Sequence, residues 1–484
     1  MGYWVGVQST PPAVLPYPTW KTLILRSCDF LGILSRITSC YKFARLRAPT
    51  SFARRAVGAY IDGSGAAGCP FSFRSITSNS LDSFVIISTT FTMGAETILS
   101  HTEHIPAWGD LTLTLKGELA HATKIPKLPN EICGPLAWNP STFESDADYT
   151  ITLDDREIKE VRSAISHFNE ELDLSGSEVS TTTFPLPTLG PKLRQAAEDV
   201  HNGKGFVVVR GIRDMQPGEF SPEDKIIIFL GISSYIAGAR GRQDENGNML
   251  SHIRNAKLSK TPQSQRPTRY SSRASTFHTD TFCDILALQS RSNAMEGGAT
   301  LVSSTWTVYN KLQKEHPELC ELLAQPIWPF DSRGSFFPCS TRPLLYHHDG
   351  KVMMNFAREP LLGLEDVKRK AGLPVLSQEQ KNALEIVERF ATEGQISINT
   401  EPGDLLFINN HGVLHSREEF TDAVENPRYL VRMWLKNEEL AWDLPEDLQY
   451  GNSRIYDRDN GLGERWNLVD TPRIEFAVAE RLTS

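Results

Sequence analysis

The 484-residue chain lacks the features that mark a membrane, disulfide-rich or nucleic-acid-binding protein. Its seven cysteines are scattered and odd in number, which excludes a disulfide framework and zinc-ligand spacing and favours a reducing compartment. No stretch reaches the roughly 18 consecutive apolar residues that a membrane-spanning helix requires. A net charge of −9 without a basic stripe argues against binding to nucleic-acid phosphates. The sequence also contains no internal repeat and no low-complexity run.

The basic charge that the chain does carry is enriched near its amino terminus. Residues 1–92 have nine Lys and Arg against three Asp, a balance of +6, whereas the remainder has 41 basic and 56 acidic residues, a balance of −15. This Ser-rich, Arg-rich composition without Glu is typical of a mitochondrial transit segment. It also fits a disordered extension, or an extension upstream of a working start near Met93. We favour the last two interpretations, which predict a cytoplasmic protein; a genuine transit segment would predict a mitochondrial one.

Three regions are expected beyond the leader: a loop-rich lead-in at 93–150, a main domain at 151–450 and a C-terminal tail at 451–484. Apolar spacing and cap residues predict a helix over 158–172 capped by Asp154, one over 189–200 that stops at Gly203, one over 305–323, and one that opens at Ser377. β-prone runs predict strands at 205–211 and, after a tight turn at 402–404, at 405–408, and Asp349-Gly350 predicts a hairpin turn. The first two helices are expected to pack on one edge of a sheet.

The most informative pattern is His278-Thr279-Asp280, followed by His415. In an extended strand, residues i and i+2 point to the same face, so His278 and Asp280 can bind one ion together. A histidine from a distant strand would complete a two-His, one-carboxylate set, which suits non-haem Fe(II) and leaves coordination positions open. These three residues are the predicted metal ligands, and His411 is a rival for the position of His415.

Two further motifs indicate an anionic co-substrate. The glycines at 297–298 allow a tight turn, after which Thr300 begins a β-prone run with a hydroxyl available. Arg428 and Arg432 share one strand face with Leu430, and two arginines on an inward face are costly unless they meet an anion. A guanidinium matches a carboxylate with two parallel hydrogen bonds, so a dicarboxylate is expected here.

In this order the motifs resemble the TauD/TfdA (taurine dioxygenase, clavaminate synthase-like) family of Fe(II)/2-oxoglutarate-dependent oxygenases. The family's motifs fall on this chain as follows: His-x-Asp on 278–280, Gly-Gly-x-Thr on 297–300, Asp-Asn-x-x-x-x-His on 409–415 and Arg-x-x-x-Arg on 428–432. The chain departs from the family at Asn409, where many members carry an acid, and at His411, where they carry an arginine. Neither is a ligand position.

The resemblance implies a mainly β fold with α insertions, a double-stranded β-helix (jelly roll) flanked by helices. It implies Fe(II) held by the three ligands, with 2-oxoglutarate and O2 as co-substrates. Thr300 and Arg428 would hold the distal carboxylate of 2-oxoglutarate, and Arg432 would lie beside the co-substrate or an anionic substrate group. Weaker candidates for substrate contact are His252, Tyr270, Asn355 and Arg358.

The predicted function is the oxidation, usually hydroxylation, of a small organic substrate with release of succinate and CO2. Desaturation and ring closure are alternative outcomes of the same chemistry. The rival hypotheses are a Jumonji-like demethylase, a γ-butyrobetaine or trimethyllysine hydroxylase, and an inactive jelly-roll binding protein. The motif order favours the taurine dioxygenase branch, and the cysteine-rich zinc module of the second rival is missing. No pattern predicts an oligomeric state.

Overall fold

The computed structural model describes residues 73–75, 87–89, 127–171, 174–213, 218–332, 340–458 and 463–477. The chain divides into two units, Met1–Ile105 and Pro106–Ser484. In the first unit the described residues form one antiparallel pair, β1 (Phe73–Ser75) and β2 (Ile87–Thr89). The remaining predictions for the leader and for most of the lead-in lie outside the described residues.

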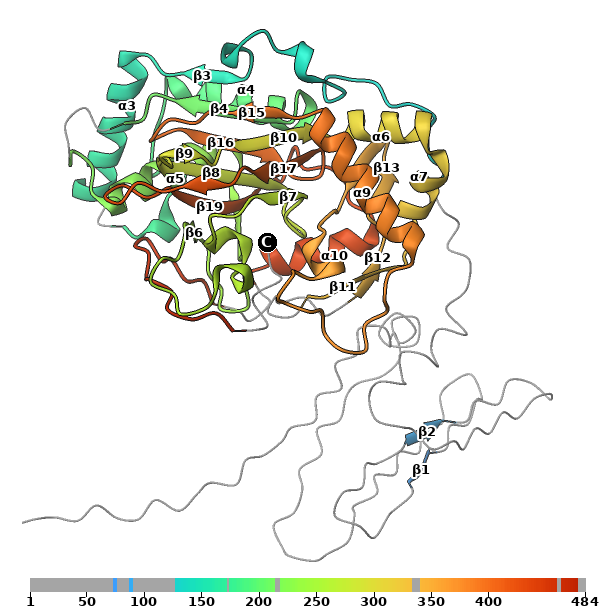
Figure 1. Cartoon of the computed structure of the whole chain (residues 1–484). Coiled ribbons are helices and arrows are strands. Elements are labelled where there is room, and N and C mark those ends of the chain that lie inside the picture. The colour runs from blue at the N-terminus through green and yellow to red at the C-terminus, as the bar shows by residue number, and fades with distance from the viewer. Residues whose placement is uncertain are drawn as a thin grey trace, which may run out of the picture. The chain divides into compact units, whose positions relative to one another are not determined.

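Two β-sheets form the body of the second unit (Figure 1). The larger sheet has the order β3-β4-β16-β8-β19-β5, and β6 also pairs with β19. Its strands are β3 (Thr150–Thr152), β4 (Phe206–Arg210), β5 (Ala239–Gly241), β6 (Ser251–Ile253), β8 (Ile285–Ser292), β16 (Leu405–Asn409) and β19 (Tyr429–Lys436). The predicted strands at 205–211 and 405–408 are therefore confirmed as β4 and β16.

The smaller sheet has the order β15-β10-β17-β7. Its strands are β7 (Ser275–His278), β10 (Thr300–Ser304), β15 (Ile396–Ile398) and β17 (Val413–Arg417), and a separate short pair joins β9 (Glu296–Gly297) to β18 (Phe420–Thr421). Leu288 and Leu406 of the larger sheet share one buried cluster with Val302 and Leu414 of the smaller sheet. An apolar core thus lies between the sheets, and the predicted double-stranded β-helix flanked by helices is confirmed.

Strand β16 is buried on both faces, and its side chains alternate between two cores. Leu406 and Ile408 belong to the core between the sheets, whereas Leu405 and Phe407 belong to a second core with helices α4 (Leu189–Asn202) and α5 (Pro222–Ile236). The period of two in a strand produces this alternation. The helix predicted at 158–172 contributes to the same core as α4. Both predicted helices therefore pack against a face of the larger sheet, and the expectation that they pack on its edge is wrong.

Local sequence signals account for most of these helices. Asp154 caps α3 (Asp155–Ser166), accepting hydrogen bonds from the backbone N–H groups of Arg156 and Glu157, as predicted. The helix continues as a π-helical turn, η5 (His167–Glu171). α4 ends at Gly203, also as predicted. α5 was not predicted, because its run from Ile226 to Ile236 is apolar on nearly every side and shows no helical period.

The chain between the His278 and His415 strands holds most of the helical insertions (Figure 1). They are α6 (Thr305–Glu315), α7 (Pro317–Leu323), α8 (Glu359–Leu362), α9 (Gln378–Glu393) and the hairpins β11 (Trp328–Phe330)–β12 (Ser340–Arg342) and β13 (Leu345–His348)–β14 (Lys351–Met354). The Ser377 cap of α9 and the turn at Asp349-Gly350 are confirmed. A single helix over 305–323 is wrong, because Pro317 lacks the N–H that would continue α6 and opens α7 instead.

The C-terminal part of the chain belongs to the folded unit. α10 (Glu446–Tyr456) spans the boundary expected at residue 450, and the backbone of Arg465 exchanges hydrogen bonds with Gly247 and Met249. Short helical turns complete the fold at η3 (Pro140–Thr142), η4 (Asp146–Asp148), η6 (Gly176–Glu178), η7 (Gln263–Gln265) and η8 (Thr268–Tyr270). Within the described ranges, no helix has the length and apolarity needed to cross a bilayer.

Gly231 allows α5 to pack closely against the buried ring of Phe184. A Cβ added at Gly231 would overlap that ring. We expect Gly231→Ala to lower the free energy of unfolding by roughly 1–3 kcal/mol, although alanine favours helix by about 1 kcal/mol. Gly238→Ala is the control, since its Cβ would enter open space. Denaturant unfolding checks this, and equal stability of the two variants would contradict it.

Candidate functional site

The smaller sheet brings His278 and His415 together. In the antiparallel pair of β7 and β17, these two residues lie directly opposite each other, with their ring centroids 4.2 Å apart. β7 ends at His278, so Asp280 does not continue the strand as the sequence predicted. The chain leaves the sheet because the N–H of Thr279 donates to the carbonyl of Phe356 at 2.7 Å. Asp280 then turns back toward both histidines.

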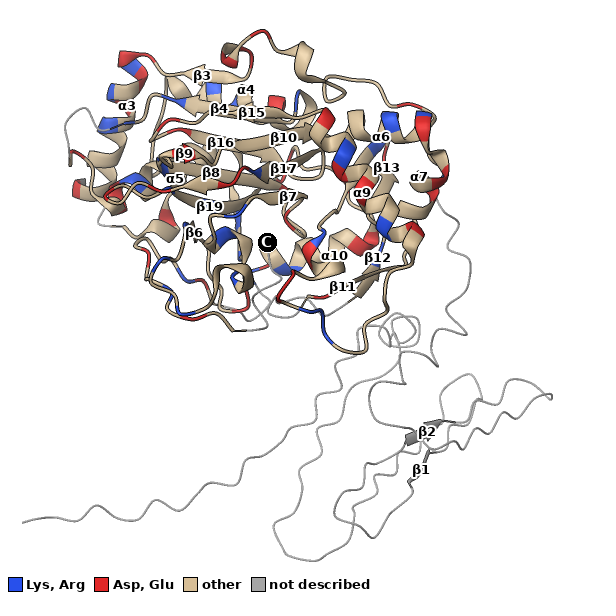
Figure 2. Ribbon diagram, in the orientation of Figure 1, with Lys and Arg blue, Asp and Glu red and all other residues tan. Residues whose placement is uncertain are grey.

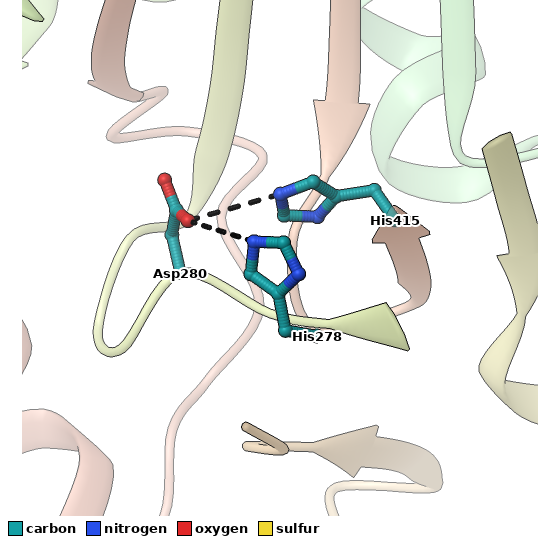
Figure 3. A group of neighbouring side chains, drawn as sticks. All are labelled: His278, Asp280 and His415. Carbon is teal, nitrogen blue, oxygen red and sulfur yellow. Dashed lines mark ion pairs between the residues drawn. The ribbon is translucent and has the colours of Figure 1, made fainter. Parts of the chain in front are cut away.

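One oxygen of Asp280 faces both imidazole rings (Figure 3). Its Oδ1 lies 3.9 Å from Nε2 of His278 and 3.7 Å from Nε2 of His415. One ligand atom from each residue can be chosen so that all lie within 4.8 Å of one another. This is the spacing of three groups around one ion, and among the residues that the structure describes no other such cluster occurs.

The other oxygen of Asp280 is already occupied. Its Oδ2 lies 2.9 Å from Nη1 of Arg432 and accepts a 2.6 Å hydrogen bond from Nε1 of Trp434. Oδ1 is buried and has no hydrogen-bond partner within the described ranges. Burial tends to raise the pKa of Asp280, but Arg432 and the two histidines outweigh it and hold this pKa below its ordinary value. Asp280 therefore presents one negatively charged, unpaired oxygen to the histidines.

The histidines present lone pairs to the same point. Nδ1 of His278 lies 2.8 Å from the carbonyl of Thr276, which only accepts, so Nδ1 is a donor and the metal-facing atom of this ring is Nε2. Burial, with a smaller contribution from His278, lowers the pKa of His415 to about 3, so this ring is neutral. Two imidazole Nε2 atoms and an unpaired carboxylate oxygen, gathered in a protein interior, fit a divalent cation such as Fe(II).

Asn410 fixes the loop that carries Asp280. The Asn410 side chain is fully buried; its Oδ1 accepts from the N–H of Asp280, and its Nδ2 donates to the carbonyls of Asp280 and Cys283, each at 2.7 Å. Asn355, a predicted substrate contact, lies behind the same loop, where it binds Arg342 and the carbonyl of Thr281. It does not line the pocket beside the three candidate ligands.

A pocket opens beside the candidate ligands, and we call it the metal pocket. Its wall includes the predicted residues His278, Thr300, His415, Arg358, Arg428 and Arg432, the unpredicted Arg269 and Arg417, and the apolar side chains Ile253, Leu286, Leu288 and Leu430. Figure 2 shows basic residues gathered along β19 and the segments near β6. The alternation along β19 that sequence predicted is thus present, with Arg428, Leu430 and Arg432 on the pocket side.

Arg428 enters the metal pocket beside Thr300. Its Nε donates to the carbonyl of Gly298 at 3.0 Å, and a Cβ on Gly298 would approach its side chain to 2.9 Å. The glycine therefore leaves space for the arginine, and its φ of +78° allows the turn into β10. Burial lowers the pKa of Arg428 to about 10. Its Nη1 is buried and has no hydrogen-bond partner in the described part of the chain.

Arg417 is a pocket residue that the sequence analysis missed. It follows His415 by two residues on β17, and the strand period of two places both side chains on the pocket side. This spacing from His415 is the sequence feature that could have predicted Arg417 as a pocket residue. Nη1 donates to the carbonyl of Thr268 at 3.2 Å and Nη2 to that of Ser271 at 3.0 Å. Burial and the nearby charge of Arg428 lower the pKa of Arg417 to about 9.

Of the remaining substrate candidates, His252 and Tyr270 lie apart from the metal pocket. His252 is buried between the hydroxyl of Tyr429, at 2.6 Å, and the carbonyl of Asn467, at 2.7 Å. His252 and Tyr270 line a neighbouring pocket and not the metal pocket. Arg358 does line the metal pocket, and it pairs with Glu385.

The chain is similar in sequence to known proteins. Residues 170–434 match the family model "Taurine catabolism dioxygenase TauD, TfdA family". The chain is 32% identical over 374 residues to the taurine hydroxylase-like protein SAT17 of Stachybotrys chartarum (strain CBS 109288 / IBT 7711), covering 76% of this chain and 95% of that protein. It is 24% identical over 321 residues to the FR-33289 synthase of Streptomyces rubellomurinus (strain ATCC 31215), covering 64% and 92%.

Among solved structures, an asparagine oxygenase in complex with Fe(II), 2S,3S-3-hydroxyasparagine and succinate aligns with a TM-score of 0.46 and 15% identity, covering 59% of this chain and 93% of that one. The family assignment rests on the family model and on the SAT17 relative, since both cover more than half of the chain. The chain belongs to the TauD/TfdA family of Fe(II)- and 2-oxoglutarate-dependent oxygenases.

Proposed function

We propose that this enzyme hydroxylates a small organic substrate and converts 2-oxoglutarate to succinate and CO2, with His278, Asp280 and His415 as the Fe(II) ligands. The observation that carries the proposal is the single unpaired oxygen of Asp280 facing both Nε2 atoms. When bound, Fe(II) supplies the activation of O2, one atom of which enters succinate and the other the substrate. The name of the SAT17 relative, a taurine hydroxylase-like protein, supports hydroxylation of a small molecule.

The metal pocket suits 2-oxoglutarate because its wall combines basic and apolar side chains. Arg428 and Thr300 would hold the distal carboxylate, with the charge of Arg417 close to Arg428. Leu288 and Leu430 lie on the pocket wall and would contact the methylene groups of the co-substrate while excluding water. A buried guanidinium with an unpaired N–H gains most from a carboxylate that accepts two hydrogen bonds.

Arg432 has a different role in this proposal from the one that the sequence predicted. Its Nη1 binds Oδ2 of Asp280 and its Nε donates to Oε1 of Gln243 at 2.8 Å. Together with Trp434, it holds one carboxylate oxygen so that the other points to the metal position. Arg432 is therefore proposed as a positioning residue for Asp280, and 2-oxoglutarate would depend mainly on Arg428.

Binding of Fe(II) and 2-oxoglutarate to the full chain tests the proposal. Anaerobic calorimetry should show 2-oxoglutarate binding that depends on Fe(II), and admission of O2 should give succinate and CO2 in equal amounts. His278→Ala should lose both, whereas His347→Ala, on the β13–β14 hairpin outside the metal pocket, should retain both. If wild-type protein binds neither ligand, the proposal is wrong. Binding without succinate, even with small acids and amines added, would support the inactive binding protein.

The role of Asn410 gives a second prediction. Asn410→Ala should lower the affinity for Fe(II) by about 10- to 100-fold, because the loop carrying Asp280 loses three hydrogen bonds. Stability should also fall by roughly 1–3 kcal/mol, since buried backbone groups are left unpaired. Anaerobic equilibrium dialysis and thermal unfolding measure the two effects. Asn202→Ala, at an exposed position on α4, is the control. A loss of stability with unchanged Fe(II) affinity would contradict the positioning role.

A further inference from the structure

Three asparagines from distant parts of the chain hold the loop of residues 280–284, which we call the Asp280 loop. Each of its five consecutive backbone carbonyls accepts a hydrogen bond from one of them. The donors are Asn355 to residue 281, Asn410 to residues 280, 283 and 284, and Asn452 to residue 282. All three asparagines are buried. Buried carbonyls outside a helix or sheet need donors from elsewhere, and a side-chain amide can supply two.

One of the three asparagines lies outside the part of the chain that matches the family model. Asn355 directly follows β14 and Asn410 directly follows β16, and both fall within the matched residues 170–434. Asn452 lies on α10, beyond residue 434. The C-terminal helix therefore contributes to the support of a candidate metal ligand that belongs to the family domain.

Helix α10 contacts the Asp280 loop through three of its residues. Nδ2 of Asn452 donates to the carbonyl of Phe282 and to Oδ2 of Asp284, each at 2.9 Å. The hydroxyl of Tyr456 accepts from the N–H of Asp284 at 3.3 Å. Gly451 lies against the ring of Phe282, where an added Cβ would overlap that ring. Residues four apart share a face of a helix, so one face of α10 packs against the loop.

The carboxylate of Asp284 connects α10 to the segment that carries Asn410. Its Oδ2 accepts from Asn452, and its Oδ1 lies 3.1 Å from Nε2 of His411. Asp284 and His411 are both buried. His411, the rival that the sequence offered for the position of His415, thus meets Asp284 and is not part of the ligand cluster. Because His411 adjoins Asn410, a displacement of Asp284 would reach Asp280 by two routes, along the loop and through Asn410.

We propose that α10 is a positioning element of the metal centre, in which Asn452 and Tyr456 hold the Asp280 loop so that Oδ1 of Asp280 faces the two histidines. This rests on the proposed function, since it takes Asp280 as an Fe(II) ligand. A loop that is bonded at every carbonyl keeps its carboxylate in one orientation before the metal arrives. Binding then requires less ordering of the ligands, which increases affinity. Loss of the α10 contacts should therefore weaken Fe(II) binding.

Asn452→Asp tests the proposal in the full chain. This variant keeps the shape of the side chain and an oxygen for Lys436, whose Nζ donates to Oδ1 of Asn452 at 2.7 Å. It removes both donors to the Asp280 loop and places an acid beside Asp284. Fe(II) affinity, measured by anaerobic equilibrium dialysis, should fall about 10- to 100-fold. With Fe(II) saturating, the KM for 2-oxoglutarate should stay near the wild-type value, since Arg428 is unchanged.

Matched variants separate positioning from a general loss of stability. Gly231→Ala is expected to destabilise the chain where α5 packs against Phe184, and it should keep wild-type Fe(II) affinity. Ser453→Ala, at an exposed position next to Asn452, should change neither stability nor affinity appreciably. Tyr456→Phe is a milder second variant, because it keeps the ring and removes only the hydroxyl that accepts from Asp284. It should weaken Fe(II) binding in the same direction as Asn452→Asp.

The outcomes distinguish this proposal from the proposed function. It is overturned if Asn452→Asp and Tyr456→Phe bind Fe(II) as wild type does, or if Asn452→Asp loses no more affinity than Gly231→Ala. If Asn452→Asp does not fold, Tyr456→Phe decides the question by the same measurement. Failure of the wild-type protein to bind Fe(II) would instead reject the proposed function.

Discussion

Asp280→Asn is expected to abolish turnover and to lower the affinity for Fe(II). The loss of affinity should exceed the roughly 10- to 100-fold that follows from changing a residue that only positions a metal ligand. The substitution keeps an oxygen for Trp434 and Arg432, so the loop can retain its position. It replaces the oxygen that faces His278 and His415 with an NH2 group, which cannot donate a lone pair to a cation. Anaerobic equilibrium dialysis with Fe(II), alongside succinate production, measures the effect.

A matched substitution and a second variant make that result interpretable. Asp443→Asn alters an exposed aspartate that pairs with His348 at 3.0 Å, and it should leave Fe(II) affinity unchanged. Asp280→Ala should be less stable than Asp280→Asn by roughly 1–3 kcal/mol, because it also leaves the buried N–H groups of Arg432 and Trp434 without an oxygen acceptor. Wild-type Fe(II) affinity in Asp280→Asn would show that the metal lies elsewhere.

Arg428→Gln is expected to raise the KM for 2-oxoglutarate about 100-fold, with a smaller effect on kcat at saturation. The reason is that a buried, charged fork of donors is replaced by a neutral amide in the part of the pocket that holds Thr300. Arg428→Lys should recover only part of the loss, since an ammonium cannot form two parallel hydrogen bonds to a carboxylate. Steady-state kinetics of succinate formation with varied 2-oxoglutarate checks both variants.

The comparison with Arg432 tests whether the two arginines have different roles. Arg432→Gln should weaken Fe(II) binding more than 2-oxoglutarate binding, because Arg432 contacts Asp280. Arg389→Gln, at a largely exposed position on α9, should change neither. An unchanged KM in Arg428→Gln, or equal effects of the two pocket variants on both ligands, would contradict the division of roles.

Local sequence determined much of this protein. The cap at Asp154, the turn at 402–404 and the alternation along β19 all depend on residues a few positions apart, and each appears in the structure as expected. The motif at 278–280 with His415 likewise predicted three residues that the fold brings together. Such patterns can be recognised in a sequence because the helix and strand periods determine which neighbouring side chains share a face.

Tertiary structure decided which partner each of these side chains meets. Arg432 pairs with Asp280, and Asn355 and His252 are buried by contacts with Thr281 and Asn467, which no local pattern indicates. The C-terminal stretch, expected to be a tail, packs on the folded unit, where Arg465 exchanges backbone hydrogen bonds with Gly247 and Met249. A polar side chain has several chemically acceptable partners, and packing across distant segments selects among them. Sequence therefore determined the three candidate ligands and the β-helix, whereas only the assembled core determined that Arg432 is the arginine that contacts Asp280.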